Sequence, residues 1–220
     1  MLSPIANSNI IHRVAKVIWG SGTGTGVFVD YRDTMYFITA YHVVKGIKDG
    51  HLLTIMPHTG KEVTVTVRIV CMSPDADYIV FTFDEFAGQL PLANLPVHLD
   101  LEFTLTQEAL YVGYPKGLVM TGGDGQGIPK TLPLFKQGII SALDSSDPAD
   151  QFILLDSAGN AGFSGGPIFV VEKQLAAGGG ITHLIGIVLA NLRDDETGNY
   201  LFAYARSIKQ ITDHLVQDHK

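Results

Sequence analysis

The stretch that most constrains the fold is residues 159–167, which read Gly159-Asn160-Ala161-Gly162-Phe163-Ser164-Gly165-Gly166-Pro167. Glycine adopts left-handed backbone conformations without a steric penalty, so glycines on both sides of one serine predict a tight turn. The missing side chains also let another chain approach the serine closely. A strand-like apolar run begins at Pro167. The hydroxyl group of Ser164 is therefore a candidate nucleophile on a turn that leads into a strand.

Two upstream residues supply the groups that such a serine needs. His42 follows a buried-strand pattern, and Asp77 precedes one. A serine hydroxyl is a weak nucleophile at neutral pH, and an imidazole titrates in the range that lets it accept the proton. A carboxylate on the second ring nitrogen orients the imidazole and stabilises its charged form. Asp77 is preferred over Asp75 because Asp77 directly precedes the apolar run, whereas Asp75 is followed by Ala76 and another charge.

The glycine-rich turn also suggests where negative charge would be stabilised. When a nucleophile attacks a carbonyl group, charge develops on the carbonyl oxygen, and preorganised main-chain N–H groups stabilise it. We assign this oxyanion hole to the N–H groups of Gly162 and Ser164.

Short strand-like runs fill most of the chain, and the pattern predicts an all-β protein of barrels or a sandwich. The runs are residues 14–19, 26–30, 35–39, 62–67, 78–83, 109–113, 137–142, 152–155, 167–171 and 183–188. The second and third of these runs predict a hairpin. A helix is expected at the C-terminal end, because Ser207 and Gln210 match a capping box. Ile208, Ile211 and Leu215 would then share one face of a helix that runs to about Asp218.

Composition narrows the functional classes. The 220 residues include 22 acidic and 15 basic side chains, for a net charge of −7, which argues against nucleic acid as the main partner. The only cysteine, Cys71, cannot form an internal disulfide and is expected to be buried. No secretory signal and no apolar run long enough to span a membrane are recognisable. These features predict a cytoplasmic protein without membrane contact.

Three segments together resemble the hallmark blocks of trypsin-like serine proteases, in particular the disulfide-poor bacterial branch that includes HtrA/Deg proteases. The blocks are residues 39–44, 77–81 and 162–167, with supporting similarity at residues 24–28, 113–115, 186–188 and 202–204. The resemblance covers residues 14 to 216 and implies a chymotrypsin fold, all-β, with two antiparallel six-stranded β-barrels and a C-terminal α-helix. The barrels would span residues 1–95, with His42 and Asp77, and residues 96–205, with Ser164. The helix would occupy residues 206–220, a linker residues 90–101, and no accessory PDZ-like domain is expected.

The same resemblance implies a serine endopeptidase that acts on protein or peptide substrates through an acyl-enzyme, without a cofactor. Ala158 would form the base of the specificity pocket, where it offers no charge. Leu189, Ala190 and Asn191 would form the wall that pairs with the substrate backbone as an added strand. Cleavage after small or medium apolar residues is therefore expected.

Phe163 departs from the family pattern, because activated trypsins carry an aspartate there that pairs with a newly freed N-terminus. No activation step of that kind is expected. The family's turn can also be collapsed until a ligand binds. An alternative interpretation is therefore a latent peptide-binding or scaffold protein that needs a regulatory protein partner for activation. A metal site at His51 and His58 is not expected, because their spacing matches no metal motif.

Overall fold

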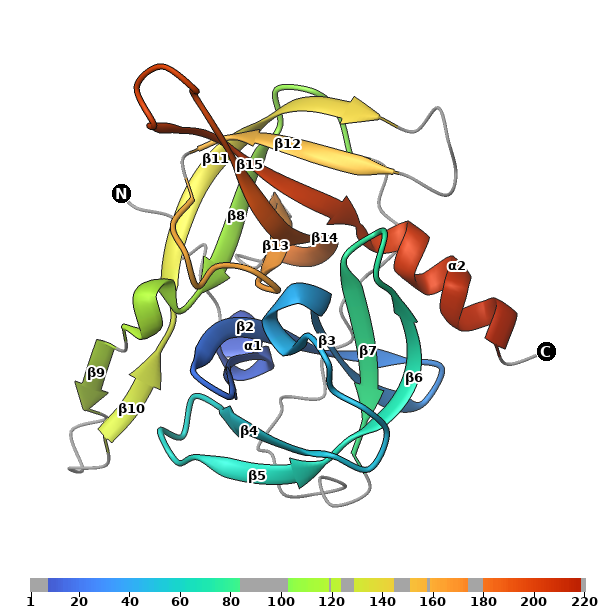
Figure 1. Cartoon of the computed structure of the whole chain (residues 1–220). Helices are drawn as coiled ribbons and strands as arrows, with labels where there is room; N and C mark the ends of the chain where they lie inside the picture. The colour runs from blue at the N-terminus through green and yellow to red at the C-terminus, as the bar shows by residue number, and fades with distance from the viewer. Residues whose placement is uncertain are drawn as a thin grey trace.

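The computed structural model of the chain describes residues 8–83, 103–118, 120–123, 129–144, 151–157, 159–173 and 180–218. It is a mainly β-structure with one helix near each end (Figure 1). Helix α1 spans Ser8–Arg13 and α2 spans Ile208–Asp218, while the 3₁₀ turns η1 and η3 span Tyr41–Val44 and Pro115–Gly117. The predicted linker at residues 90–101 lies outside the described residues. Neither helix in the described part of the chain has the length and apolar content needed to cross a membrane.

The N-terminal half forms a seven-stranded antiparallel sheet in the order β5-β4-β1-β2-β3-β7-β6. Its strands are β1 (Val14–Trp19), β2 (Gly22–Tyr31), β3 (Thr34–Ala40), β4 (Leu52–Met56), β5 (Val63–Thr66), β6 (Arg68–Ser73) and β7 (Tyr78–Thr82). The predicted hairpin is confirmed as β2 and β3. Its turn residues Arg32 and Asp33 both have positive φ, 49° and 61°. Such a turn matches the right-handed twist of the strands that it joins.

The two outer strands of this sheet are consecutive in the chain, because Val67 joins the end of β5 to the start of β6. The N–H of Val67 donates to the carbonyl of His51 at 2.9 Å, and its carbonyl accepts from the N–H of Gly50, also at 2.9 Å. The barrel predicted for this half is found as a half-barrel of seven described strands, in which one long strand is divided into β5 and β6 at Val67.

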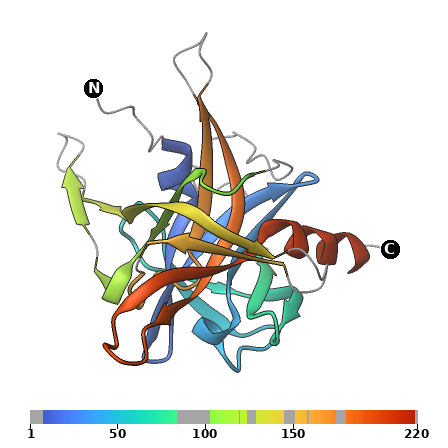
Figure 2. The same cartoon turned by 90° about the horizontal axis from the view of Figure 1, so that it is seen from above.

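The C-terminal half forms the predicted closed six-stranded barrel, in the order β11-β12-β15-β14-β13-β8. Its strands are β8 (Glu108–Gly113), β11 (Leu134–Asp144), β12 (Phe152–Asp156), β13 (Pro167–Lys173), β14 (Gly180–Arg193) and β15 (Tyr200–Ser207). The hairpin of β13 and β14 projects beyond the other strands (Figure 2). A separate ribbon of β9 (Met120–Gly123) and β10 (Pro129–Leu132) stands at one side (Figures 1 and 2).

The two halves share part of their apolar core. Phe28 and Phe37 pack with their ring centroids 4.7 Å apart inside the first sheet. Phe169 and Leu184 of the C-terminal barrel belong to the same buried cluster. Close packing of this kind resists displacement of one half against the other. The loops at the junction of the halves are therefore held in fixed relative positions.

Helix α2 has the predicted apolar face, and Ile208, Ile211 and Leu215 are all buried. The N–H of Lys209 reaches the Ser207 hydroxyl at 3.3 Å. The reciprocal half of the predicted capping box is wrong, because the N–H of Ser207 donates to the carbonyl of Gln151 at 3.1 Å. The carbonyl of the residue just before β12 has taken the donor that the Gln210 side chain would have satisfied. Cys71 is buried, as predicted.

Candidate active site

His42 lies in η1, the 3₁₀ turn that follows β3 directly. Strand β3 ends at Ala40, and Val43 and Val44 are buried within the turn. These two apolar side chains anchor η1 on the sheet, so the residue before them faces outward. The His42 side chain is 46% exposed, which leaves its ring accessible to a ligand in solution.

Asp77 is bonded to His42 twice. One carboxylate oxygen lies 2.7 Å from Nδ1 of the His42 ring, and the other accepts the main-chain N–H of His42 at 2.9 Å. The carbonyl of Asp77 also accepts the N–H of Tyr41 at 3.1 Å. Asp75 is exposed. The structure therefore pairs His42 with Asp77, and the double contact sets both the position and the plane of the imidazole ring.

The backbone of Asp77 is itself unusual, with a φ of 56°. A left-handed conformation costs an L-residue roughly 1–2 kcal/mol, so surrounding contacts must hold it. The hydrogen bonds to His42 and Tyr41 are part of that support. The sequence contains no signal for this conformation.

Ser164 lies in the turn between β12 and β13, where the two halves of the protein meet. Its carbonyl accepts the N–H of Thr25 at 2.9 Å. At the next residue, a Cβ atom added to Gly165 would lie 2.8 Å from the main-chain nitrogen of Ala40. Ala40 is two residues before His42, so the turn is packed against the segment that carries the imidazole.

The hydroxyl group of Ser164 donates to the carbonyl of Leu189 at 3.2 Å. Within the described residues, no hydrogen bond joins it to His42. Rotation about the Cα–Cβ bond of an accessible serine takes place in picoseconds to nanoseconds. Hydrogen bonds between catalytic groups are also often completed only when substrate binds. In this structure the Ser164 hydroxyl therefore points to the Leu189 carbonyl and not to His42.

The carbonyl groups of the turn before Ser164 are all occupied. Their donors are the N–H of Lys116 for Ala161 (2.6 Å), the hydroxyl of Thr25 for Gly162 (2.7 Å), and the N–H of Gly166 for Phe163 (2.7 Å). In a trans peptide the C=O and N–H groups point in opposite directions. Tying back the carbonyls of Ala161 and Phe163 therefore turns the N–H groups of Gly162 and Ser164 the other way. Neither N–H has an acceptor among the residues that the structure describes.

Gly162 is the residue that makes this turn possible. Its φ is 102°, a conformation that side chains disfavour. A Cβ atom at this position would also lie 2.8 Å from the nitrogen of Lys116 and closer still to the carbonyl oxygen of Tyr114. Both the dihedral angle and the space therefore require glycine.

The side chain of Phe163 is buried among aromatic and cationic groups. Its ring meets Tyr111 edge-on with centroids 5.0 Å apart, and the Lys136 ammonium lies 5.9 Å from its centroid. Burial lowers the pKa of Lys136 and raises that of Tyr111, whose hydroxyl pairs with Ser157 at 3.0 Å. Phe163, at the position where activated trypsins carry an aspartate, therefore lies in an apolar and cation–π environment.

The predicted substrate-binding residues are only partly described. Ala158 lies outside the described residues. Leu189 is buried and Ala190 is exposed, while the side chain of Asn191 lies against Gly159. The Oδ1 atom of Asn191 is buried without a hydrogen-bond partner. Asn191 therefore spans the space between its own strand and the segment that leads to Ser164.

Thr25 is the residue that sequence reasoning missed. It is fully buried and bonds to Ser164, Gly162 and Tyr114. In the sequence, residues 24–28 show only a resemblance to the family. The glycines that flank Thr25 were the one available sign of close packing, and the structure bears out that packing at Gly24, where a Cβ atom would lie 2.6 Å from Val43.

Within the described ranges, His, Cys, Asp and Glu side chains form no group of three or more that could hold a metal ion. His51 stacks on Trp19 and His58 stacks on His12.

Known proteins match this chain in sequence and in structure. The family model described as a trypsin-like peptidase domain matches residues 24–177. Protease Do-like 1, chloroplastic, from Arabidopsis thaliana is 28% identical over 149 residues, which are 67% of this chain and 30% of the relative. The chain thus spans less than a third of the length of that curated relative.

Solved structures show the same fold. A serine endoprotease from Yersinia pestis superposes with a TM-score of 0.63 at 21% identity, covering 96% of this chain and 65% of the other. An inactive form of Rv3671c from M. tuberculosis gives 0.62 at 14% identity, covering 99% and 97%. The HtrA-type protease AlgW with a tripeptide gives 0.63 at 24% identity, covering 94% and 60%.

Proposed function

Because the chain belongs to the family of trypsin-like peptidase domains, we propose that it is a serine endopeptidase that cleaves peptide bonds through an acyl-enzyme on Ser164. The observation that carries the proposal is the twofold contact between Asp77 and His42. It is the arrangement that keeps one imidazole nitrogen protonated and leaves the other free to accept a proton. The packing of the Ser164 turn beside the same segment supports the proposal further.

The first chemical step transfers a proton and forms a bond. The Ser164 hydroxyl turns from the Leu189 carbonyl toward the ring of His42, which accepts the proton as the oxygen attacks the substrate carbonyl carbon. The imidazolium then forms beside the Asp77 carboxylate. The carbonyl oxygen becomes an oxyanion, and the N–H groups of Gly162 and Ser164 would stabilise it. Each such donor typically contributes about 10²–10³ in rate.

The second half of the reaction returns the proton and releases both products. The imidazolium of His42 donates its proton to the leaving amine, and the peptide bond breaks to leave an ester on Ser164. Water then attacks the ester and gives a proton to His42, which acts again as the base. The bond between the acyl carbon and the Ser164 oxygen breaks as His42 returns the proton to that oxygen, and the acid product leaves. His42 thus carries every proton transfer in this scheme.

The proposed substrates are proteins or peptides that bind as an added strand along Leu189, Ala190 and Asn191. We assign a preference for small or medium apolar residues at the cleaved position. The contact between Asn191 and Gly159 supports this preference, because it narrows the space beside Ser164.

A second candidate is a latent peptide-binding protein that becomes active with a regulatory partner. It is favoured by one observation, the hydrogen bond from Ser164 to Leu189 in place of one to His42. A partner that stabilised the rotated hydroxyl would then switch the enzyme on.

Labelling with a fluorophosphonate probe, combined with casein hydrolysis, tests both candidates. The chain starting at Met1 should be labelled and should hydrolyse casein, and Ser164→Ala should abolish both. A chain that is silent alone but is labelled and active when a peptide is added would favour the latent protein. A folded chain that is neither labelled nor active, with peptides or without, would contradict the endopeptidase proposal.

A further inference from the structure

The two residues on either side of Asp77 are both bonded to the C-terminal segment of the chain. The carbonyl of Ala76 accepts a hydrogen bond from Nε of Arg206 at 3.2 Å. The hydroxyl of Tyr78 lies 2.7 Å from Nδ1 of His214. The partners are 130 and 136 residues apart in sequence, so these links form only in the folded protein.

The loop's own hydrogen bonds are long. The N–H of Asp77 donates to Pro74, and the N–H of Ala76 donates to Ser73, both at 3.3 Å. They add little to the support that the loop receives from the cross-chain links and from the pairing of Ser73 with Tyr78. Since Asp77 also has a left-handed backbone, its carboxylate would lose its aim if the flanking residues moved.

Arg206 is held mainly by burial. It is 3% exposed, its guanidinium lies 5.9 Å from the centroid of the Tyr204 ring, and its hydrogen bonds to the side chains of Gln210 and Tyr204 are long, both at 3.4 Å. A planar guanidinium with several fixed partners places each of its N–H groups along a set direction. The N–H on Nε is therefore a fixed donor for Ala76 rather than a mobile surface cation.

Helix α2 carries the second link and is firmly seated. Its residues Ile208, Ile211 and Leu215 are buried, and the helix packs against β14 and β6 (Figure 1). Because the buried face fixes the rotation of the helix, His214 is held facing Tyr78.

We propose that Arg206 and His214 are positioning residues, a clamp from the C-terminal half that aims the carboxylate of Asp77 at His42. The proposal rests on the endopeptidase function proposed above and extends it. It makes the geometry of one half of the site depend on residues of the other half. Any ligand or modification that shifts α2 would change the orientation of His42.

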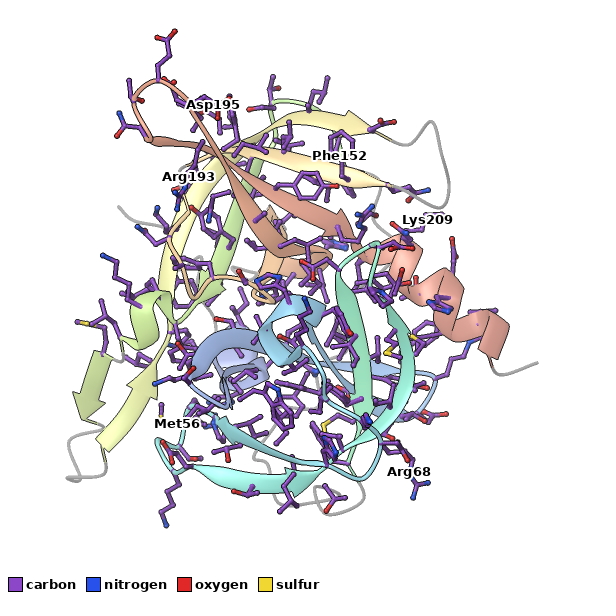
Figure 3. All side chains as sticks on the ribbon, viewed as in Figure 1. Met56, Arg68, Phe152, Arg193, Asp195 and Lys209 are labelled. Atoms are coloured by element: carbon purple, nitrogen blue, oxygen red, sulfur yellow. The ribbon has the colours of Figure 1, made fainter. Side chains whose placement is uncertain are left out.

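Two substitutions remove the links with little change in shape. Arg206→Met deletes the donor to Ala76, and Tyr78→Phe deletes a single hydroxyl group. Lys209→Ala is the matched control, because Lys209 lies at the surface of α2 (Figure 3) and pairs with Asp213 at 2.6 Å instead of with a residue of the loop. All rates are divided by the fraction of sites that a fluorophosphonate titrates, which removes any loss of folded protein.

The expected result is a fall in kcat of tenfold or more for the first two variants, with KM changed less than twofold and Lys209→Ala unchanged. The carboxylate stabilises the imidazolium, so loosening it should also move the acidic limb of the kcat/KM profile to lower pH. In an Asp77→Asn background, Arg206→Met should have little further effect on kcat, because both act through one carboxylate. Equal effects in the two backgrounds would contradict the proposal.

Proton NMR of the Ser164→Ala protein measures the effect of the clamp without any activity. The charged and titratable groups on the loop or bonded to it are Asp75, Asp77, Tyr78, Arg206 and His214. The proton between Nδ1 of His42 and Asp77 gives a downfield signal when that hydrogen bond is held, and the clamp predicts that the signal weakens or moves upfield in both variants. An unchanged signal would overturn the clamp even if the chain is an active peptidase. A changed signal in a chain without peptidase activity would support the clamp and contradict only the proposed function.

Discussion

The hydroxyl group of Thr25 donates a 2.7 Å hydrogen bond to the carbonyl of Gly162, 137 residues further along the chain. The same oxygen accepts the N–H of Tyr114 at 3.0 Å, and the main-chain N–H of Thr25 donates to Ser164. A residue of the first sheet thus fixes the turn that carries Ser164. The proposed oxyanion hole therefore depends on both halves of the protein.

Thr25→Val tests this dependence, because it replaces the hydroxyl with a methyl group of similar size. It leaves a buried carbonyl and a buried N–H without their partner, which should lower the unfolding free energy by about 1–3 kcal/mol. It should also reduce kcat per titrated site. Thr25→Ser is the matched control, since it keeps the hydroxyl. Urea denaturation and steady-state kinetics measure both effects, and equal kcat values for Val and Ser variants would argue against a positioning effect of the hydroxyl.

Asp77→Asn should lower kcat by about 10⁴-fold, because an amide no longer holds the imidazole in the productive tautomer. The neighbouring carboxylate provides the control. Asp75 is exposed, so Asp75→Asn should leave the rate within twofold. Peptide hydrolysis by the two purified variants decides the assignment, and the reverse ranking would show that the wrong carboxylate has been named.

Gly162→Ala should disable the turn, since its φ of 102° and the nearby Lys116 nitrogen leave no room for a methyl group. We expect a loss of at least 10²-fold in kcat as the N–H donor is displaced. Gly198→Ala is matched in backbone, with a φ of 68°, but has no atom within 4 Å of the added carbon. It should cost about 1 kcal/mol of stability and leave turnover unaffected. Similar turnover in the two variants would show that crowding at Gly162 does not matter.

Asn191→Gly should widen the specificity of the enzyme, because it removes the side chain that lies against Gly159. Peptides with Leu or Phe at the cleaved position should gain at least tenfold in kcat/KM relative to Ala, a change of the size that pocket volume produces. Asn199→Gly, at an exposed residue before β15, is the control. A peptide-library profile that is the same for all three proteins would remove Asn191 from the specificity pocket.

The buried phenol of Tyr114 should make the folded protein less stable in alkali. Its phenol is fully buried, and this burial raises its pKa well above the ordinary 10.0. In the unfolded chain the phenol loses its proton near pH 10, whereas in the folded protein it keeps it. The folded state then binds more protons, so the unfolding free energy falls as pH rises above about 10. Urea denaturation from pH 8 to 11 measures the slope, which should be shallower for Tyr114→Phe; an unchanged slope would assign the loss to other groups.

Local patterns were reliable where neighbouring residues decide the outcome. The strand at residues 14–19 is found as β1, and Ile208, Ile211 and Leu215 form the buried face of α2, since period and burial are properties of a short segment. The capping box failed because Gln151, distant in sequence, supplied the acceptor for Ser207. The division of one long strand into β5 and β6 at Val67 was not predicted, because periodicity does not reveal its hydrogen bonds to His51 and Gly50.

The sequence by itself determined which chemical groups are present and their order along the chain: an imidazole, a carboxylate and a hydroxyl, each beside a strand. It also determined that the serine turn needs glycine. Only the tertiary structure decided how those groups are aimed, through Thr25 on the Ser164 turn and Arg206 on the Asp77 loop. The physical reason is that aim depends on hydrogen bonds between residues more than a hundred positions apart. Such bonds leave no periodic trace in the sequence.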